Sequence, residues 1–230
     1  MLAFVDIEHR KVIDNPEKGP HHLKDYYQRV DNIAAAVGLP CKPVHYLDFS
    51  LDWLRANDIK AFFISGNTPD WDEYDWDEFK PLQQAVTSGA YPVMGFCGGH
   101  QLIGMTFGAP CDALGPLAPG ELDPMPEYHP GMRKEKGYLP FQVHTPGHPL
   151  FEGFPPGGPV IMESHYWEVK ALPAGFALLA STDWCRIQVM QHRELPIYST
   201  QGHPEAYTEA FPDGKRFIRN FARATGVIRG

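Results

Sequence analysis

Short apolar blocks alternate along the chain with longer stretches in which apolar residues recur every three or four positions. The short blocks predict buried strands at residues 2–5, 43–47, 61–64, 93–96 and 197–200. The periodic stretches predict helices at residues 21–37, 51–54, 79–86, 102–107 and 213–222. The first helix is predicted to bury Leu23, Tyr27, Val30, Ile33 and Ala34. Alternating strands and helices favour an α/β fold.

Residues 1–230 are predicted to form a single domain, because this length is enough to bury a substantial core. The hydrophobic content of 43% excludes general disorder, and the formal net charge of −8 argues against a nucleic-acid-binding surface. No stretch approaches the roughly 20 apolar residues of a membrane span, so no membrane association is expected. The four cysteines show neither a CxxC pair nor zinc-like spacing, which favours reduced thiols in the cytoplasm and predicts no metal or other cofactor.

Residues 91–104 have the pattern of a nucleophile elbow. The strand at 93–96 leads into a glycine-rich turn at Cys97, and a helical stretch follows. The neighbouring glycines suit a nucleophile held in a strained backbone conformation. The first turn of the helix offers free N–H groups and a positive dipole end, which favour the thiolate. A buried structural cysteine is the competing interpretation.

A second segment, residues 196–205, supplies what a nucleophilic cysteine needs. A short apolar strand ends close to His203, and Glu205 follows two residues later. A cysteine nucleophile requires a base to accept its proton, and the base requires an acceptor to orient it. Cys97, His203 and Glu205 are therefore the predicted catalytic residues.

Residues 95–101 (GFCGGHQ) and 201–205 (QGHPE) together resemble the two signatures of the class I, or triad, glutamine amidotransferases. The resemblance covers nearly the whole chain. It implies a flavodoxin-like, open and mostly parallel sheet with flanking helices. It also implies an enzyme that hydrolyses the side-chain amide of glutamine through a thioester on Cys97.

The resemblance also implies an oxyanion hole. Family members place one donor in the loop after the third strand, here Gly66 and Asn67, and a second at the residue after the nucleophile, here Gly98. Asn67 stands where the family usually has glycine, and Gly98 stands where leucine is commoner. Because asparagine tolerates left-handed backbone, we expect the loop geometry to survive.

Three further residues are implied to bind substrate. Gln101 lies one helical turn after Cys97 and is expected to contact the substrate amide. The main chain of Ser164 and His165 is expected to bind the α-amino and α-carboxylate groups of glutamine. A role for His165 as a second base is rejected, because no carboxylate comparable to Glu205 stands next to it in the sequence.

We expect the ammonia to pass to a separate synthase subunit. The first strand begins at residue 2 and the chain ends 25 residues after Glu205 (230 − 205 = 25), so no fused synthase is expected. One alternative is a γ-glutamyl hydrolase or peptidase of the same superfamily, because Gly202 replaces the usual bulky aromatic before His203. That loss could open the pocket to a γ-glutamyl compound larger than glutamine. A non-catalytic interaction subunit is the other alternative, and the intact catalytic residues argue against it.

The acidic and aromatic stretch at residues 70–79 predicts a solvated rim beside the active site. A metal site and a docking patch are the alternatives. Because the stretch follows the oxyanion loop, a partner that contacts Trp71, Tyr74 or Trp76 could reposition the loop. We therefore expect the isolated chain to be a poor glutaminase that a partner activates.

Overall fold

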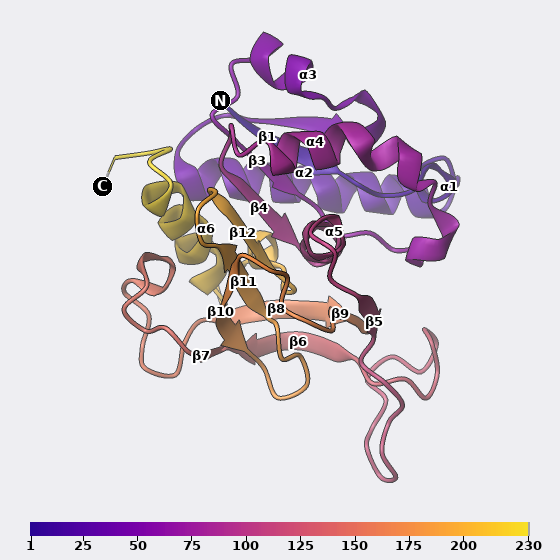
Figure 1. Cartoon of the computed structure of the whole chain (residues 1–230). Helices are drawn as coiled ribbons and strands as arrows, with labels where there is room; N and C mark the ends of the chain where they lie inside the picture. The colour runs from indigo at the N-terminus through magenta and orange to yellow at the C-terminus, as the bar shows by residue number, and fades with distance from the viewer. Residues whose placement is uncertain (230) are drawn as a thin grey trace.

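The computed structural model describes residues 1–229, and its centre is an eight-stranded sheet in the order β2-β1-β3-β4-β12-β11-β10-β7 (Figure 1). The parallel part consists of β2 (Cys41–His45), β1 (Leu2–Asp6), β3 (Ala61–Ile64), β4 (Val93–Phe96) and β12 (Ile197–Thr200). The antiparallel part continues with β11 (Val189–His192), β10 (Phe176–Ser181) and β7 (Gln142–Val143). The predicted open, mostly parallel sheet is confirmed.

Helices cover both faces of this sheet, because alternate residues of each strand point to opposite sides. One face carries α2 (Lys18–Val37) and α6 (Asp213–Ala224), which pack on Phe4 and Phe63. The other face carries α3 (Leu51–Ala56), α4 (Lys80–Thr87) and α5 (Gly98–Thr106), which pack on Val5 and Phe62. The short helix α1 (Arg10–Ile13) precedes α2.

The predicted buried face of α2 is wrong in part. Leu23 and Tyr27 are 37% and 53% exposed, whereas Tyr26 is buried. The Tyr26 hydroxyl donates to the carbonyl oxygen of Phe4, and the two rings stack with centroids 5.0 Å apart. This polar anchor on β1 sets the rotation of the helix, and apolar periodicity alone does not reveal it.

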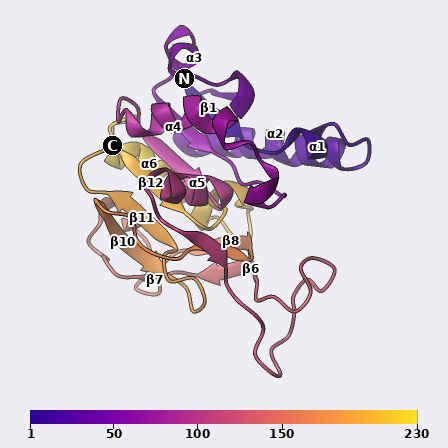
Figure 2. The ribbon, with the colours of Figure 1, turned by 45° about the vertical axis from the view of Figure 1, so that its right-hand side comes forward.

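Two small antiparallel sheets complete the fold beside the main sheet. One pairs β5 (Cys111–Ala113) with β9 (Trp167–Val169), and the other pairs β6 (Glu135–Pro140) with β8 (Val160–His165). Phe141 separates β6 from β7, and β7 joins the main sheet. The segment between β5 and β6 extends away from the rest of the molecule (Figure 2).

Short 3₁₀ turns connect several elements within residues 1–229. They span Tyr46–Asp48, Trp71–Glu73, Trp76–Phe79, Pro149–Phe151 and Pro204–Ala206. In the part of the chain that the structure describes, no helix has both the length and the apolar character needed to cross a membrane.

Candidate active site

Cys97 lies between β4 and α5 in a strained backbone conformation. Its φ of 49° and ψ of −107° are values that residues with a side chain rarely adopt. A Cβ on Gly95 would lie 2.4 Å from the carbonyl oxygen of Gly99, and one on Gly99 would lie 2.6 Å from that of Ile64. The turn therefore requires both glycines. The N–H of Cys97 donates to the carbonyl oxygen of Thr200 at 2.9 Å, which ties the turn to β12.

His203 follows β12 and lies beside Cys97, and the charge of each side chain acts on the other. His203 Nδ1 and Glu205 Oε1 are 2.8 Å apart. A Cβ on Gly66 would lie 3.1 Å from Cε1 of His203 and 3.3 Å from Cβ of Cys97. Glycine at position 66 thus lets both side chains approach the loop after β3. The fold brings the three predicted catalytic residues together.

Glu205 is also held from α2, which the sequence motifs do not reveal. Arg29 Nη1 lies 3.5 Å from Glu205 Oε1, and Asn32 Nδ2 donates to the Glu205 carbonyl oxygen at 2.9 Å. Glu205 is fully buried, so its charge needs such partners. In the sequence, Arg29 and Asn32 share only a three-residue spacing that places them on one face of a helix. Polar residues at this spacing are common on exposed helices, so the spacing does not predict a contact with Glu205.

Charge favours the reactive form of the cysteine. Burial raises the pKa of the Cys97 thiol, but the charge and hydrogen bond of His203 outweigh burial, so the pKa lies below its ordinary value. Burial lowers the pKa of His203, but the charges of Glu205 and Cys97 raise it to about 9. The two side chains therefore stabilise one another as a thiolate and an imidazolium.

Gly66 and Asn67 lie next to Gly98, as the predicted oxyanion hole requires. A Cβ on Gly98 would lie 3.0 Å from the backbone nitrogen of Asn67. The loop does not need the left-handed tolerance of asparagine, because Asn67 has a negative φ. Within residues 1–229 the non-glycine residues with positive φ are Asp58, Cys97 and His129. Asparagine in place of glycine therefore brings no left-handed strain to the loop.

The two departures from the family pattern in this region fit one another. A Cβ on Gly98 would lie only 1.9 Å from Oδ1 of Asn67, so the Asn67 side chain fills the space that a larger residue 98 would use. Asn67 Nδ2 donates to the carbonyl oxygen of Pro69 at 2.8 Å, which fixes the side chain there. Each substitution accommodates the other.

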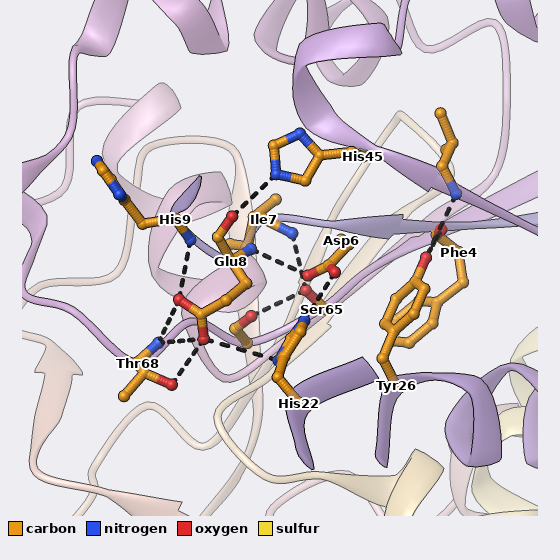
Figure 3. Close-up of polar contacts among 12 residues, drawn as sticks. Phe4, Asp6, Ile7, Glu8, His9, His22, Tyr26, His45, Ser65 and Thr68 are labelled. Carbon is orange, nitrogen blue, oxygen red and sulfur yellow. Dashed lines mark hydrogen bonds and ion pairs between the residues drawn. The ribbon is translucent and has the colours of Figure 1, made fainter. Parts of the chain in front are cut away.

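The oxyanion loop is anchored to the end of β1 by polar contacts (Figure 3). Ser65 Oγ accepts the N–H of Ile7 at 3.0 Å. Thr68 donates its N–H at 3.1 Å and its hydroxyl at 2.6 Å to Glu8 Oε2. Figure 3 shows the Glu8 carboxylate between Thr68 and the imidazole of His22, whose Nδ1 is 3.9 Å from Oε2. The loop is thus held in place by contacts within the chain.

Gln101 belongs to a chain of side-chain amides that ends at the nucleophile. Trp71 Nε1 donates to Gln101 Oε1 at 2.7 Å, and Gln101 Nε2 donates to the carbonyl oxygen of Trp167 and to Gln201 Oε1, both at 3.2 Å. Gln201 Nε2 donates to Cys97 Sγ at 3.6 Å. Gln201 is a further site residue: it opens the second signature, residues 201–205, but the sequence alone assigned it no role.

Two cavities meet at Cys97. The smaller, of about 50 Å³, has Gln101, Ser164 and His165 among its lining residues, and these are the predicted substrate-binding residues. The larger, of about 650 Å³, is lined by the oxyanion loop, His203 and residues of α2. The carbonyl oxygen of Ser164 on β8 lies 3.9 Å from Cys97 Sγ, so β8 forms one side of the site.

The reason given for rejecting His165 as a second base, that no comparable carboxylate stands next to it, is wrong. His165 Nε2 lies 2.9 Å from Glu135 Oε2 and 3.4 Å from Glu163 Oε2. Glu135 is 30 residues away from His165 in the sequence (165 − 135 = 30), and the pairing of β6 with β8 brings the two side chains together.

The inference that Gly202 opens the pocket is also wrong. A Cβ on Gly202 would lie 2.3 Å from Glu163 Oε1 and 2.9 Å from Cγ2 of Ile161. The space that an aromatic residue would occupy is filled by Glu163 and Ile161. The glycine accommodates a buried carboxylate and adds no room for a larger substrate.

The aromatic residues of the acidic stretch point inward. Trp71 and Tyr74 are buried, and Trp71 stacks on Trp76 with ring centroids 5.5 Å apart. The acidic residues between them face the solvent, as the predicted rim requires. A partner therefore cannot contact Trp71 or Tyr74, and of the three expected contacts Trp76 alone is partly exposed.

Comparison with known proteins decides the family. The family model for glutamine amidotransferase class-I matches residues 22–225. The chain belongs to the class I glutamine amidotransferases. The predicted fold and the two sequence signatures agree with this membership.

Relatives of this amidotransferase include a GMP synthase [glutamine-hydrolyzing] subunit of Pyrococcus furiosus, which is 38% identical over 138 residues. That match covers 60% of this chain and 62% of the relative, so it spans less than two thirds of the relative's length. The protein of the same name from Methanocaldococcus jannaschii is 28% identical over 204 residues, which cover 87% of this chain and 93% of the relative.

Solved structures agree with the sheet topology of the amidotransferase. The crystal structure of a candidate GMP synthase subunit from Thermoplasma acidophilum has a TM-score of 0.68 at 25% identity and covers 99% of this chain and 95% of its own. A glutamine amido transferase from Methylobacillus flagellatus, at 18% identity and a TM-score of 0.59, shares the fold over 90% of this chain and 70% of its own.

Proposed function

We propose that this protein is a cysteine-dependent glutaminase that supplies ammonia to a separate synthase subunit. The observation that carries the proposal is the meeting of Cys97, His203 and the buried Glu205 with an anchored oxyanion loop. The relatives named as glutamine-hydrolyzing subunits of GMP synthase support the same interpretation. Residues 1–230 act in this proposal as one amidotransferase domain.

The Cys97 thiolate attacks the γ-carboxamide carbon of glutamine, and backbone N–H groups at Gly66, Asn67 and Gly98 stabilise the oxyanion. One such donor typically contributes about 3–4 kcal/mol. The His203 imidazolium then protonates the departing ammonia, which leaves a γ-glutamyl thioester on Cys97. A water molecule that gives its proton to His203 hydrolyses the thioester to glutamate.

Substrate binding uses the smaller cavity. Gln101 contacts the amide region of glutamine, and the main chain of Ser164 and His165 binds its α-amino and α-carboxylate groups. The crowding of Gly202 by Glu163 favours glutamine over a larger γ-glutamyl compound. All four cysteines are free thiols, which fits our placement of the protein in the cytoplasm.

The synthase docks, in this proposal, over the larger cavity beside α2. That cavity touches both Cys97 and His203, where ammonia is released, and exposed charged residues such as Lys18 and Asp25 lie on its rim. Asp25→Arg is expected to weaken ammonia transfer to the synthase and leave glutamine hydrolysis by the isolated chain unchanged. Asp52→Arg on α3, away from this cavity, is the matched control.

Ammonia release from glutamine by the purified chain tests the proposal. Cys97→Ala is expected to abolish release, whereas Cys41→Ala on β2 is expected to preserve it. γ-Glutamyl peptides are offered as competing substrates in the same assay. Faster cleavage of these peptides than of glutamine, or undiminished release by Cys97→Ala, would overturn the proposal.

A further inference from the structure

Three ionisable side chains meet on the inner face of the β6–β8 sheet. Glu163 and His165 stand two residues apart on β8 and therefore point to the same side. Glu135 is the direct partner of His165 across the strand pair. All three side chains are buried, with exposed fractions of 3% or less. A buried cluster of this kind is costly unless its charges compensate one another.

The hydrogen-bond geometry indicates the charge of His165. Its Nε2 lies 2.9 Å from Glu135 Oε2, and its Nδ1 lies 2.9 Å from the carbonyl oxygen of Trp167. Glu135 Oε1 already accepts the hydroxyl of Thr182 at 2.6 Å. A carbonyl and a carboxylate only accept, so a ring that satisfies both must donate from both nitrogens. With Glu135 ionised, that ring is an imidazolium.

The side chain of Glu163 takes up the space beside Gly202, so position 202 has no room for a larger residue. Both carboxylate oxygens of Glu163 lack a well-formed hydrogen bond within residues 1–229, although Oε2 lies 3.4 Å from His165 Nε2. Its Oε1 occupies the space above Gly202, one residue before His203. Burial raises the pKa of Glu163, and the positive ring of His165 opposes that rise, so the ring favours an ionised Glu163 at this position.

We propose that Glu135 and Glu163 hold His165 as a permanent imidazolium, and that His165 is a positioning residue for the glutamine-hydrolysing site. It fixes the Ser164–Trp167 edge of the substrate cavity and adds a second positive charge beside the Cys97 thiolate. The positioning role of His165 rests on the proposed function, whereas its fixed positive charge does not depend on any substrate.

Two contacts connect His165 to the reacting atoms. The Trp167 carbonyl oxygen accepts from His165 Nδ1 and also from Gln101 Nε2. The Ser164 carbonyl oxygen, immediately before His165, lies 3.9 Å from Cys97 Sγ. A change in the charge or orientation of the ring therefore reaches both the amide-binding side chain and the nucleophile.

Electrostatics of the buried groups agree with the geometry. Burial opposes a charge on His165, but the hydrogen bond to Glu135 and the negative charge of the nearby Glu163 raise its pKa to about 10. The charge of His165 also contributes to the lowered pKa of Cys97, after the larger effect of His203. The titratable groups that face His165 are Glu135 on β6, Glu163 on β8, Cys97 and His100 at the start of α5, and Cys185 before β11.

Cys185 makes a metal ion the rival occupant of this cluster. Ligand atoms of Glu135, His165 and Cys185 all lie within 4.8 Å of one another. A metal would need Nε2 of His165 as a lone-pair donor, and that nitrogen is at hydrogen-bond distance from a carboxylate. The two occupants exclude each other, because the proton and the metal would share the same nitrogen.

Nitrogen-15 NMR of the protein with labelled histidine side chains distinguishes a protonated His165 ring from a metal-bound ring, and it needs no substrate. His165→Gln assigns the resonances. We expect both ring nitrogens of His165 to be protonated from pH 6 to pH 8, and the ring pKa to fall in the double variant Glu135→Gln/Glu163→Gln. A neutral ring at pH 7 in the wild-type protein, or one equivalent of bound zinc by elemental analysis, would overturn the proposal.

The rate of Cys97 alkylation by iodoacetamide as a function of pH tests the effect on the nucleophile. Loss of the second positive charge in His165→Gln should raise the midpoint by about one pH unit, so that alkylation at neutral pH slows up to about tenfold. His148→Gln, which removes a half-buried histidine far from Cys97, should leave the profile unchanged. An unchanged profile in a folded His165→Gln protein contradicts the inference. A shifted profile without glutamine hydrolysis by the wild-type protein would remove the proposed function and leave the electrostatic assignment intact.

Discussion

The two walls that flank Cys97 are built on different physical principles. On the parallel-sheet side, Gly66 and the elbow glycines let backbone and side chains approach closely. On the β6–β8 side, bulky ionisable groups fill the space and compensate one another's charge. Close approach of backbone requires a particular residue type at a particular place, so it leaves a motif. Charge compensation across paired strands leaves no motif.

The two buried histidines on these walls differ in the same way. His203 has one carboxylate and one thiol as partners, so its proton can pass to and from the sulfur. The partners of His165 are two carboxylates and a carbonyl oxygen, and none of these is a reacting group that could exchange a proton with it. The difference assigns proton transfer to His203 and a fixed charge to His165.

The largest expected effect comes from breaking the proton-transfer side. His203→Ala should reduce glutamine hydrolysis by about 10⁴-fold or more, whereas Glu205→Gln should leave measurable activity, because the carboxylate orients and stabilises the imidazolium without taking its proton. His165→Gln should cost only about tenfold. Single-turnover measurement of thioester formation compares the three variants. If folded His165→Gln loses as much as His203→Ala, the two roles are wrongly divided.

A double-mutant cycle tests the close packing of the oxyanion loop. Gly98→Ala forces a Cβ onto Oδ1 of Asn67 and should displace a donor, with a loss of about 10²–10³ in kcat. Asn67→Gly removes the obstruction, so Gly98→Ala/Asn67→Gly should recover most of that loss. Additive losses in the double variant would show that the two departures from the family pattern are independent.

A smaller effect is expected at the anchor of the same loop. Thr68→Val keeps the shape of the side chain but leaves the buried Glu8 carboxylate without its hydroxyl donor. The free energy of unfolding should fall by about 1–3 kcal/mol. Denaturant unfolding measures this change, and the control is Thr87→Val, whose exposed hydroxyl donates only to carbonyl oxygens of its own helix α4. Equal stability of the two variants would mean that Glu8 does not hold the loop.

The pH dependence of kcat/KM sharpens the assignment of His203. Activity should decline as pH rises through about 9, because the imidazolium that protonates the leaving ammonia is then lost. It should decline at the acid side as the Cys97 thiolate is protonated, at a pH below the ordinary thiol pKa. Glu205→Gln should move the alkaline limb to lower pH, since the charge of Glu205 raises the pKa of His203. An alkaline limb that stays in place would exclude Glu205 as its cause.

The sequence predicts the parallel sheet and the grouping of Cys97, His203 and Glu205. Each of these features rests on a short run of neighbouring residues that forms a recognisable pattern. The sequence does not predict Arg29 beside Glu205 or Glu135 beside His165, because helix packing and strand register place them there. Gly202 shows the limit most clearly. The missing aromatic is visible in the sequence, but the carboxylate of Glu163 that fills its place is visible only in the fold.

The central claim is that Cys97 is the nucleophile, and covalent labelling tests it most directly. The purified protein is treated with a glutamine-mimicking electrophile, and the adduct is mapped by mass spectrometry. We predict one adduct per chain, on Cys97, that excess glutamine suppresses and His203→Ala slows. A label on Cys41, Cys111 or Cys185 with Cys97 untouched would contradict the account.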